Sequence, residues 1–309
     1  MNAMLKKILP HPRWAVISVP YLWMVVFFAI PFLIVLKISF SKLAIAMPPY
    51  TPILEFVDEA VSLKLNLSNY IGLFTDSQYV QAYLSSIKIA GISTLLALLI
   101  GYPMAYVIAK LPPSTRNIAM MLVILPSWTS FLIRVYAWKA ILDRNGLLDQ
   151  FLQFTGLQTL MTSMGLPKLQ LIDTPTAAYI GIVYCYLPFM VLPLYANLVK
   201  HDHRLLEAAY DLGAKPWQAF LRITLPLSKA GIIAGCMLVM IPAIGEFVIP
   251  EMLGGSETLM VGRQLWNEFF NNRNWPGASA MAVAMILLLL VPILLFNRSQ
   301  QRLLEGKQA

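Results

Sequence analysis

A chain of 309 residues with 58% hydrophobic and only 12% charged residues cannot hide its apolar side chains as a soluble domain, because surface area shrinks too slowly with size. The net charge of +8 lies mostly at the ends of apolar runs rather than in a polar patch with interleaved aromatic side chains, which argues against nucleic-acid binding. Composition therefore predicts an integral membrane protein that has the lipid bilayer as its solvent.

The first apolar run follows a basic segment, residues 1–16, which contains three Lys or Arg residues. A cleaved secretory signal would have a shorter apolar run that ends in small residues of the Ala-x-Ala kind. The run from Trp14 to Leu36 is longer and has no such ending. We therefore expect residues 1–16 to form a cytoplasmic segment that precedes a retained membrane helix.

Six apolar stretches are long enough to cross a bilayer, which takes about 20 residues of α-helix. In chain order they are Ile17–Leu36, Ile87–Ala109, Ile118–Leu142, Ala177–Val199, Gly231–Pro250 and Ala278–Phe296. We expect one all-α membrane domain over residues 1–309, with a six-helix bundle at 17–296 and a tail at 297–309. Prolines interrupt most of the stretches, and because each removes a helical hydrogen bond within lipid, they favour an internal pathway over a simple anchor.

The distribution of Lys and Arg predicts the orientation of these spans. With six spans, both chain ends lie on one side of the membrane, together with the loops after the second and fourth spans. That side carries 13 of the 23 basic residues but only 4 of the 15 acidic residues. Short basic loops stay in the cytoplasm, so we expect both termini and the loop at residues 200–229 to be cytoplasmic.

Residue types that carry chemistry are scarce. Cys185 and Cys236 lie inside apolar runs and are expected to be buried, without a disulfide or metal site. The three histidines, His11, His201 and His203, have no cluster of ligands nearby. A phosphate-binding Gly-x-x-x-x-Gly-Lys-Ser/Thr loop is absent from the sequence. We therefore expect no catalytic residues, no metal and no cofactor bound by this chain.

The loop between the fourth and fifth spans contains the most specific pattern in the chain. It reads Glu207-Ala208-Ala209, three residues, Gly213, nine residues, and then Ile223-Thr224-Leu225-Pro226. Asp202 is placed to cap a helix from about His203 to Leu212, which Gly213 can end in the left-handed conformation. Pro216 suits the first turn of a second short helix. The loop is thus predicted to be a pair of short helices.

The first of these helices has a face that fits another protein. The small side chains of Ala208 and Ala209 let the helix backbone lie close in a groove, and Glu207 offers a carboxylate to a partner there. This pattern resembles the cytoplasmic Glu-Ala-Ala loop of the permease subunits of bacterial ABC importers, which has the same spacing of Gly and Ile-x-Leu-Pro. The positions that match are Glu207, Ala208, Ala209, Gly213, Ile223, Leu225 and Pro226.

The resemblance implies a fold, partners and a location. The fold would be the six-helix, MetI-like fold of type I importer permeases, located in the bacterial inner membrane. The loop would dock into a separate ATPase subunit that binds ATP and Mg²⁺. The complex would contain a second permease as heterodimer partner, two ATPase subunits and a periplasmic binding protein, and this chain would not be an enzyme.

Three further segments resemble the permeases of polyamine importers, so that the likeness covers nearly the whole chain. They are Leu125–Trp138, Pro242–Pro250 and Asn271–Pro276. Among these permeases the chain is most similar to the putrescine type, since spermidine-type permeases tend to lack an acid at the place of Glu246. The resemblance implies a polyamine as substrate, and putrescine before spermidine.

Glu246 is the one acid deep within a predicted span. An intramembrane acid is a functional candidate by default, and a cationic amine needs carboxylates and aromatic faces in exchange for water. Pro242 and Pro250 lie one turn on either side, which indicates a locally broken helix that lines a cavity. The alternative for Glu246 is a structural ion pair with Arg134.

Aromatic residues at helical spacing are further pathway candidates, although such stripes are more often packing surfaces. Ser127, Phe131, Arg134 and Trp138 would share one face of the third span, and Tyr179, Tyr186 and Phe189 one face of the fourth. As residues of the substrate pathway we select Glu246, Trp128, Trp138, Tyr186 and Arg134.

Two other classes of transporter stay open. An ABC permease for another solute, such as spermidine, an opine, sulfate or iron, would differ only in its span residues and its binding protein, and an anion importer should carry Lys or Arg in place of Glu246. An ion-coupled secondary transporter should show several intramembrane acids and inverted repeats, which this sequence lacks. A membrane-embedded enzyme would need a nucleophile–base pair or a metal cluster, which is also missing.

Overall fold

The computed structural model describes residues 12–57, 60–164, 170–202 and 204–305. Within these ranges the chain forms two compact units, one drawn from residues 1–76 and 265–286 and the other from 77–264 and 287–309. Parts of the predicted N-terminal segment and tail, and His203, lie outside the described residues. The predicted division of the chain into one membrane domain with two cytoplasmic ends stays a prediction.

The smaller unit begins with a membrane-length helix, Val16–Ser39, none of which is buried along its most apolar window. It is composed of α2 (Pro12–Met24), the π-helical turn η1 (Val25–Ala29) and α3 (Ile30–Ser39). The next elements are an antiparallel hairpin of β1 (Leu54–Val57) and β2 (Ala60–Leu63), the helix α4 (Ser68–Thr75) and the π-helical turn η4 (Asn267–Asn271). The hairpin is a small departure from an all-helical chain.

Polar side chains close the end of the first span. The hydroxyl groups of Ser39 and Tyr70 lie 2.6 Å apart, and the Asn69 amide donates to the backbone oxygens of Ser39 and Ser41. Because lipid offers no hydrogen-bond partners, these contacts satisfy carbonyl groups that the helix end leaves free. The last helix, α17 (Trp275–Glu305), contributes residues 275–286 to this unit and the rest to the larger one.

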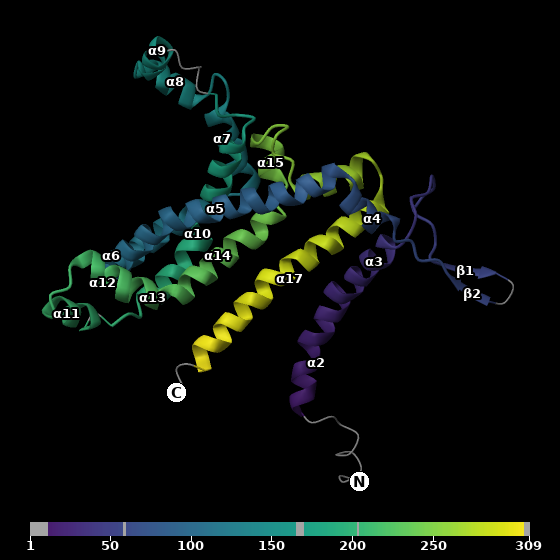
Figure 1. Cartoon of the computed structure of the whole chain (residues 1–309), viewed down its shortest axis with the longest axis horizontal. Helices are drawn as coiled ribbons and strands as arrows, with labels where there is room; N and C mark the ends of the chain where they lie inside the picture. Colours follow the sequence, from purple (N-terminus) through teal and green to yellow (C-terminus); the bar gives the residue numbers. More distant parts are fainter. Residues whose placement is uncertain (1–11, 58–59, 165–169, 203, 306–309) are drawn as a thin grey trace, which may run out of the picture. The chain divides into compact units, whose positions relative to one another are not determined.

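Three long helices form the centre of the larger unit and run side by side in Figure 1. They are α5 (Ser77–Lys110), α10 (Pro175–Leu198) and α14 (Lys229–Ile244). Met190, Leu194 and Val239 are fully buried between them. Gly101 and Gly235 both face Met190, so the absence of a side chain at these glycines lets α5 and α14 pack closely on α10.

Two predicted spans are interrupted. The third consists of α6 (Pro113–Ile124), the 3₁₀ turn η2 (Leu125–Trp128) and α7 (Phe131–Leu142), and its axis turns by 87° at residues 129–130. The fifth ends as α14 at Ile244, and α15 (Val248–Leu253) follows after residues 245–247. We refer to these as the span 3 break and the span 5 break. The prediction of one continuous helix over Ile118–Leu142 was wrong, because Pro126 cannot donate a helical hydrogen bond.

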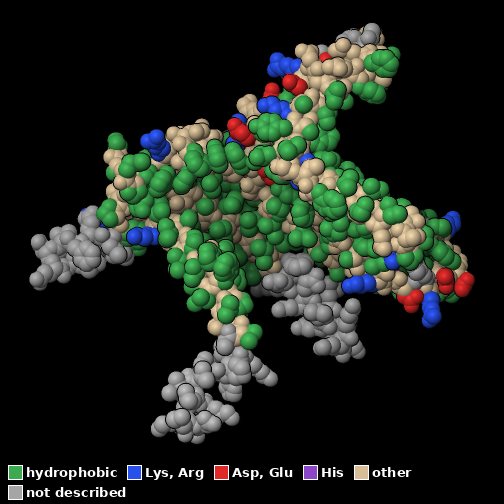
Figure 2. Space-filling model, turned by 180° about the vertical axis from the view of Figure 1, so that it is seen from behind, with side chains coloured by type: hydrophobic (Ala, Val, Ile, Leu, Met, Phe, Trp, Pro, Cys, Tyr) green, Lys and Arg blue, Asp and Glu red, His purple; other side chains and the backbone are tan. Residues whose placement is uncertain are grey.

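The described helices confirm a membrane protein of the predicted class. Four are long and apolar enough to cross a bilayer singly, and six spans result when each of two bent pairs is taken as one span. Hydrophobic side chains cover most of the face shown in Figure 2, where charged side chains are few and grouped. Shorter helices connect the spans: α8 (Leu147–Phe154), α9 (Leu157–Ser163), α11 (Arg204–Asp211), α12 (Pro216–Ala219), α13 (Leu225–Leu227) and α16 (Val261–Trp266).

Candidate functional site

The loop between the fourth and fifth spans folds as the sequence predicts. Before α11, the Asp202 carboxylate accepts a hydrogen bond of 3.0 Å from the backbone N–H of Arg204. After α11, Gly213 adopts a positive φ of 81°, and its N–H donates to the carbonyl of Tyr210 at 2.8 Å. The N–H of Ala214 donates to the carbonyl of Ala209 at 2.9 Å. These two bonds form a Schellman motif, which fixes the end of the helix.

A second short helix follows directly and leads into the fifth span. Pro216 occupies the first position of α12, and the Gln218 side chain accepts a bond of 2.9 Å from the backbone N–H of Lys215. The π-helical turn η3 (Phe220–Thr224) and α13 then carry the chain to α14. We call residues 204–228 the foot. Its two ends are fixed by local hydrogen bonds, so the foot has a defined shape.

The foot exposes several large apolar side chains. Leu212 is 89% exposed and Trp217 is 61% exposed, and Leu205 and Tyr210 are exposed as well. Glu207 and Ala208 are also exposed, whereas Ala209 is half-buried. Contiguous apolar side chains on a connecting loop are typical of a surface that meets another protein.

The foot packs directly on the ends of the spans. The Phe220 ring makes edge-to-face contacts with the rings of Tyr102 and Tyr106 on α5, each with centroids 5.8 Å apart. The Tyr102 hydroxyl lies 2.8 Å from that of Ser228. Through these contacts a displacement of the foot must move α5 as well as α14.

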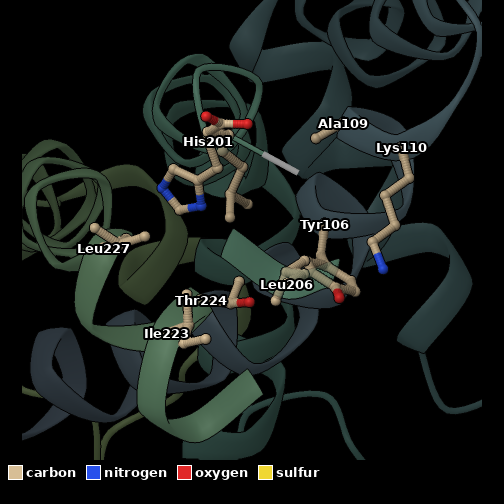
Figure 3. A pocket seen from close by; sticks show the side chains of 10 residues that line it. Tyr106, Ala109, Lys110, His201, Leu206, Ile223, Thr224 and Leu227 are labelled. Carbon is tan, nitrogen blue, oxygen red and sulfur yellow. The ribbon is translucent and has the colours of Figure 1, made fainter. Parts of the chain in front are cut away.

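A small cavity of about 30 Å³ lies between the foot and the span ends (Figure 3). Leu206 of the foot and Ile223 of η3 line it from one side, and Tyr106 of α5 lines it from the other. The Lys110 ammonium sits 4.1 Å from the centre of the Tyr106 ring. Space of this size holds at most a few water molecules, so the foot has little room to move independently of the spans.

Glu246 lies in the span 5 break and is only 7% exposed. Its Oε1 atom accepts hydrogen bonds from the backbone N–H groups of Phe247 and Val248, at 3.2 and 3.0 Å. Its Oε2 atom accepts a bond of 2.5 Å from the Tyr186 hydroxyl on α10. A carboxylate that accepts N–H groups at a helix start is a helix cap, and here it caps α15. Both oxygens of Glu246 are therefore engaged by the chain itself.

The segment that follows the span 5 break packs tightly. A Cβ atom on Gly262 of α16 would collide with the carbonyl oxygens of Gly245 and Glu246, so only glycine allows this approach. The backbone N–H of Val261 donates to the Ser86 hydroxyl of α5 at 2.7 Å. Arg263 pairs with Glu251 at 2.5 Å. Sequence reasoning missed Gly262 and Ser86, because neither belongs to a local motif.

Arg134 does not pair with Glu246. Among the described residues no ion pair joins them, and Arg134 Nε and Nη1 are buried without a hydrogen-bond partner. The guanidinium carbon lies 5.7 Å from the centre of the Phe131 ring. The hypothesis of a structural Arg134–Glu246 pair was therefore wrong for this conformation, because Tyr186 and α15 already occupy the carboxylate.

The structure separates the aromatic candidates. Tyr186 contacts Glu246 directly, whereas Trp138 packs edge-to-face on Tyr184 with centroids 5.3 Å apart. Trp128 is 73% exposed beside the span 3 break. Because that break interrupts the helix, Ser127 precedes it and does not continue the predicted stripe with residues 131, 134 and 138. Whether any of these side chains contacts a substrate stays a prediction.

An open apolar groove of about 730 Å³ lies between α6, α10 and α14. Met120, Met121, Leu192 and Leu238 contribute apolar side chains to it, and Asn117 lies at one end of α6. In the described part of the chain, no group of three or more His, Cys, Asp or Glu residues could hold a metal ion.

Comparisons with known proteins agree on one family. The family model described as "Binding-protein-dependent transport system inner membrane component" matches residues 97–305. The spermidine/putrescine transport system permease protein PotB of Haemophilus influenzae is 37% identical over 289 residues, which are 93% of each chain.

Solved structures share the fold. A bacterial ABC transporter that imports the acidic polysaccharide alginate has a chain with a TM-score of 0.67 and 17% identity, over 94% of this chain and 95% of that one. The MetNI methionine ABC transporter, in inward-facing conformations, has one with a TM-score of 0.51 and 15% identity, over 72% of this chain and 94% of that one.

Proposed function

This chain belongs to the family of inner-membrane components of binding-protein-dependent transport systems, and we propose that it is the permease subunit of an ATP-driven importer for polyamines. It is a multi-pass inner-membrane protein and a transport component rather than an enzyme. In the proposed complex, this permease provides the path through the membrane and a separate subunit provides ATP hydrolysis.

The observation that carries the proposal is the foot. We propose that residues 204–228 face the cytoplasm and dock into the ATPase through the exposed side chains around Leu212 and Trp217. Glu207, Ala208 and Ala209 lie on the same short helix, and Gly213 fixes its end. The motif positions Ile223, Leu225 and Pro226 then join the foot to the fifth span.

Closure of the ATPase would reach the membrane through packed side chains. A push on the foot moves Phe220, whose ring contacts Tyr102 and Tyr106 on α5. The hydroxyl contact between Tyr102 and Ser228 joins α5 to the start of α14. A coupling mechanism needs such a continuous path, and the small cavity behind the foot leaves little slack.

The remaining partners follow from the architecture proposed for this family. A second permease would cover the apolar groove between α6, α10 and α14 and complete the pathway as a heterodimer. Two ATPase subunits would hold ATP and Mg²⁺, and a periplasmic binding protein would deliver the substrate. Both chain ends would lie in the cytoplasm, as the Lys and Arg distribution predicts.

The proposed substrate is a polyamine, and within that class putrescine. The PotB relative is named for both spermidine and putrescine, so the likeness supports the class. The finer choice depends on Glu246 as an acid within a span. In the conformation described, Glu246 is engaged by Tyr186 and α15, so a direct contact with an amine requires that the carboxylate first be released.

Uptake by the reconstituted complex tests the proposal. The chain, its second permease and the ATPase are placed in liposomes with the binding protein, and uptake of radiolabelled putrescine, spermidine and sulfate is compared. We expect ATP-dependent uptake of amines, putrescine first, and none of sulfate. Uptake of sulfate alone would contradict the substrate class, and accumulation by this chain without the ATPase would contradict the mechanism.

A further inference from the structure

The packing around the span 5 break leaves a charged group with unmade hydrogen bonds. Arg134 lies on α7, which packs against both α10 and α15. Its Nε and Nη1 atoms are shielded from solvent and donate to nothing in the conformation described. Donors of a charged group are costly to bury unpaired, so this arrangement persists only if another conformation satisfies them.

A carboxylate is available at the same place. Arg134 and Glu246 both act electrostatically on Cys185 and Tyr186, which places the two charges beside the same turn of α10. Glu246 is held there by the Tyr186 hydroxyl and by the N–H groups of α15. Two sets of donors therefore compete for one carboxylate, and only one set is satisfied.

Both groups also lie at points where the chain can pivot. Arg134 is in the first turn of α7, just after the span 3 break, and Glu246 is within the span 5 break. A rotation at either break changes the direction of α7 or α15 without unfolding a long helix. Movements of transport proteins commonly occur at such short segments between rigid elements.

We propose that Glu246 exchanges partners during transport: Tyr186 and α15 hold its carboxylate in the conformation described here, and Arg134 holds it in the alternative one. The inference rests on the proposed function, because alternating access supplies the second conformation. Arg134 and Tyr186 are positioning residues in this scheme, since they act through Glu246 and need not touch the substrate.

The exchange predicts effects of opposite sign. Tyr186→Phe removes a donor that stabilises the described conformation, so the population should shift toward the alternative one by about fivefold, as expected for one hydrogen bond. Arg134→Gln removes the charge that stabilises the alternative, so that conformation should become at least about fivefold rarer. Arg134→Lys should recover part of it, and the double variant should return toward the wild-type ratio.

Spin-label distances in the assembled complex provide the test. Cysteines replace Ile133 on α7 and Leu238 on α14, both exposed, in a background with Cys185→Ala and Cys236→Ala. Distance distributions are recorded in nanodiscs with and without ATP, and the two populations are compared among the variants. Shifts in the same direction for Tyr186→Phe and Arg134→Gln, or no shift in an assembled complex, would overturn the proposal.

This measurement needs no substrate, so its outcome is separate from that of the uptake assay. A complex that assembles and shows opposite shifts but takes up no amine would contradict the substrate assignment and leave the partner exchange standing. A complex that transports polyamines but shows a single distance in every variant would do the reverse.

Discussion

The two helix breaks in the larger unit satisfy their backbone groups in different ways. At the span 5 break, Glu246 accepts N–H groups of the following helix and is almost fully buried. At the span 3 break, Ser130 precedes α7 without a side-chain cap, and Trp128 is largely exposed. Because a bilayer supplies no hydrogen bonds, the first break is fixed by this chain alone, whereas the second depends on what lies beside it in the complex.

The largest expected effect is at the span 5 break. Glu246→Ala removes the cap of α15 and leaves the Tyr186 hydroxyl without its acceptor, which should lower the free energy of unfolding by about 3 kcal/mol. Unfolding of the purified chain in mixed micelles, titrated with a denaturing detergent, measures this loss. Glu246→Gln keeps an acceptor oxygen and should lose about half as much. Equal stability of the Ala variant and the wild type would show that the cap contributes nothing.

The next effect concerns the close approach of α16 to the same break. Gly262→Ala places a methyl group against the carbonyl oxygens of Gly245 and Glu246 and should cost about 1–3 kcal/mol. Gly91→Ala, on α5, is the matched control, since a Cβ there meets nothing within 4 Å. Thermal unfolding in detergent compares the two. If both variants were equally stable, the packing of α16 on the break would be incorrect.

A smaller effect on stability but a clear one on coupling is expected in the foot. Gly213→Ala forces an alanine into a positive φ, at a cost of about 1–2 kcal/mol, and should misplace the end of α11. Stimulated ATPase activity of the assembled complex should fall, while Gly213→Asn, which tolerates this conformation, should retain most of it. Full activity of the Ala variant would argue against the foot as the coupling element.

The smallest effect on the isolated chain is expected at the span 3 break. Trp128→Ala removes an exposed ring and should change the free energy of unfolding by less than about 0.5 kcal/mol. If the second permease covers this break, the same variant should reduce assembly of the heterodimer, as measured by co-purification. A strong loss of stability in the isolated chain would mean that Trp128 packs within the chain after all.

The foot could be predicted because each of its devices acts on near neighbours. Asp202, Gly213 and Pro216 determine the backbone within a few residues, so their pattern fixes helix starts and ends wherever the loop lies. The structure changes only the last residue of the first helix, which is Asp211 rather than Leu212. The docking function of the foot stays a prediction, since the folded chain alone does not test it.

Glu246 shows where prediction from sequence ended. The flanking prolines correctly indicated a broken helix, but not the partner, because Tyr186 lies 60 positions earlier in the chain. The choice of Arg134 followed charge alone and overlooked the N–H groups of α15, which are as close as the next residues. Likewise, the aromatic stripe assumed a continuous third span, and periodicity carries no information about a turn of 87°.

The π-helical turn at Phe220–Thr224 gives the nine residues between Gly213 and Ile223 a rotational meaning. A π turn takes up one residue more than an α turn, and each residue of an α-helix advances the side chains by about 100°. Deleting one residue here would therefore put every later side chain of the fifth span out of phase. Gly235 would no longer meet Met190, and the interval would act as an angular setting between motor and membrane.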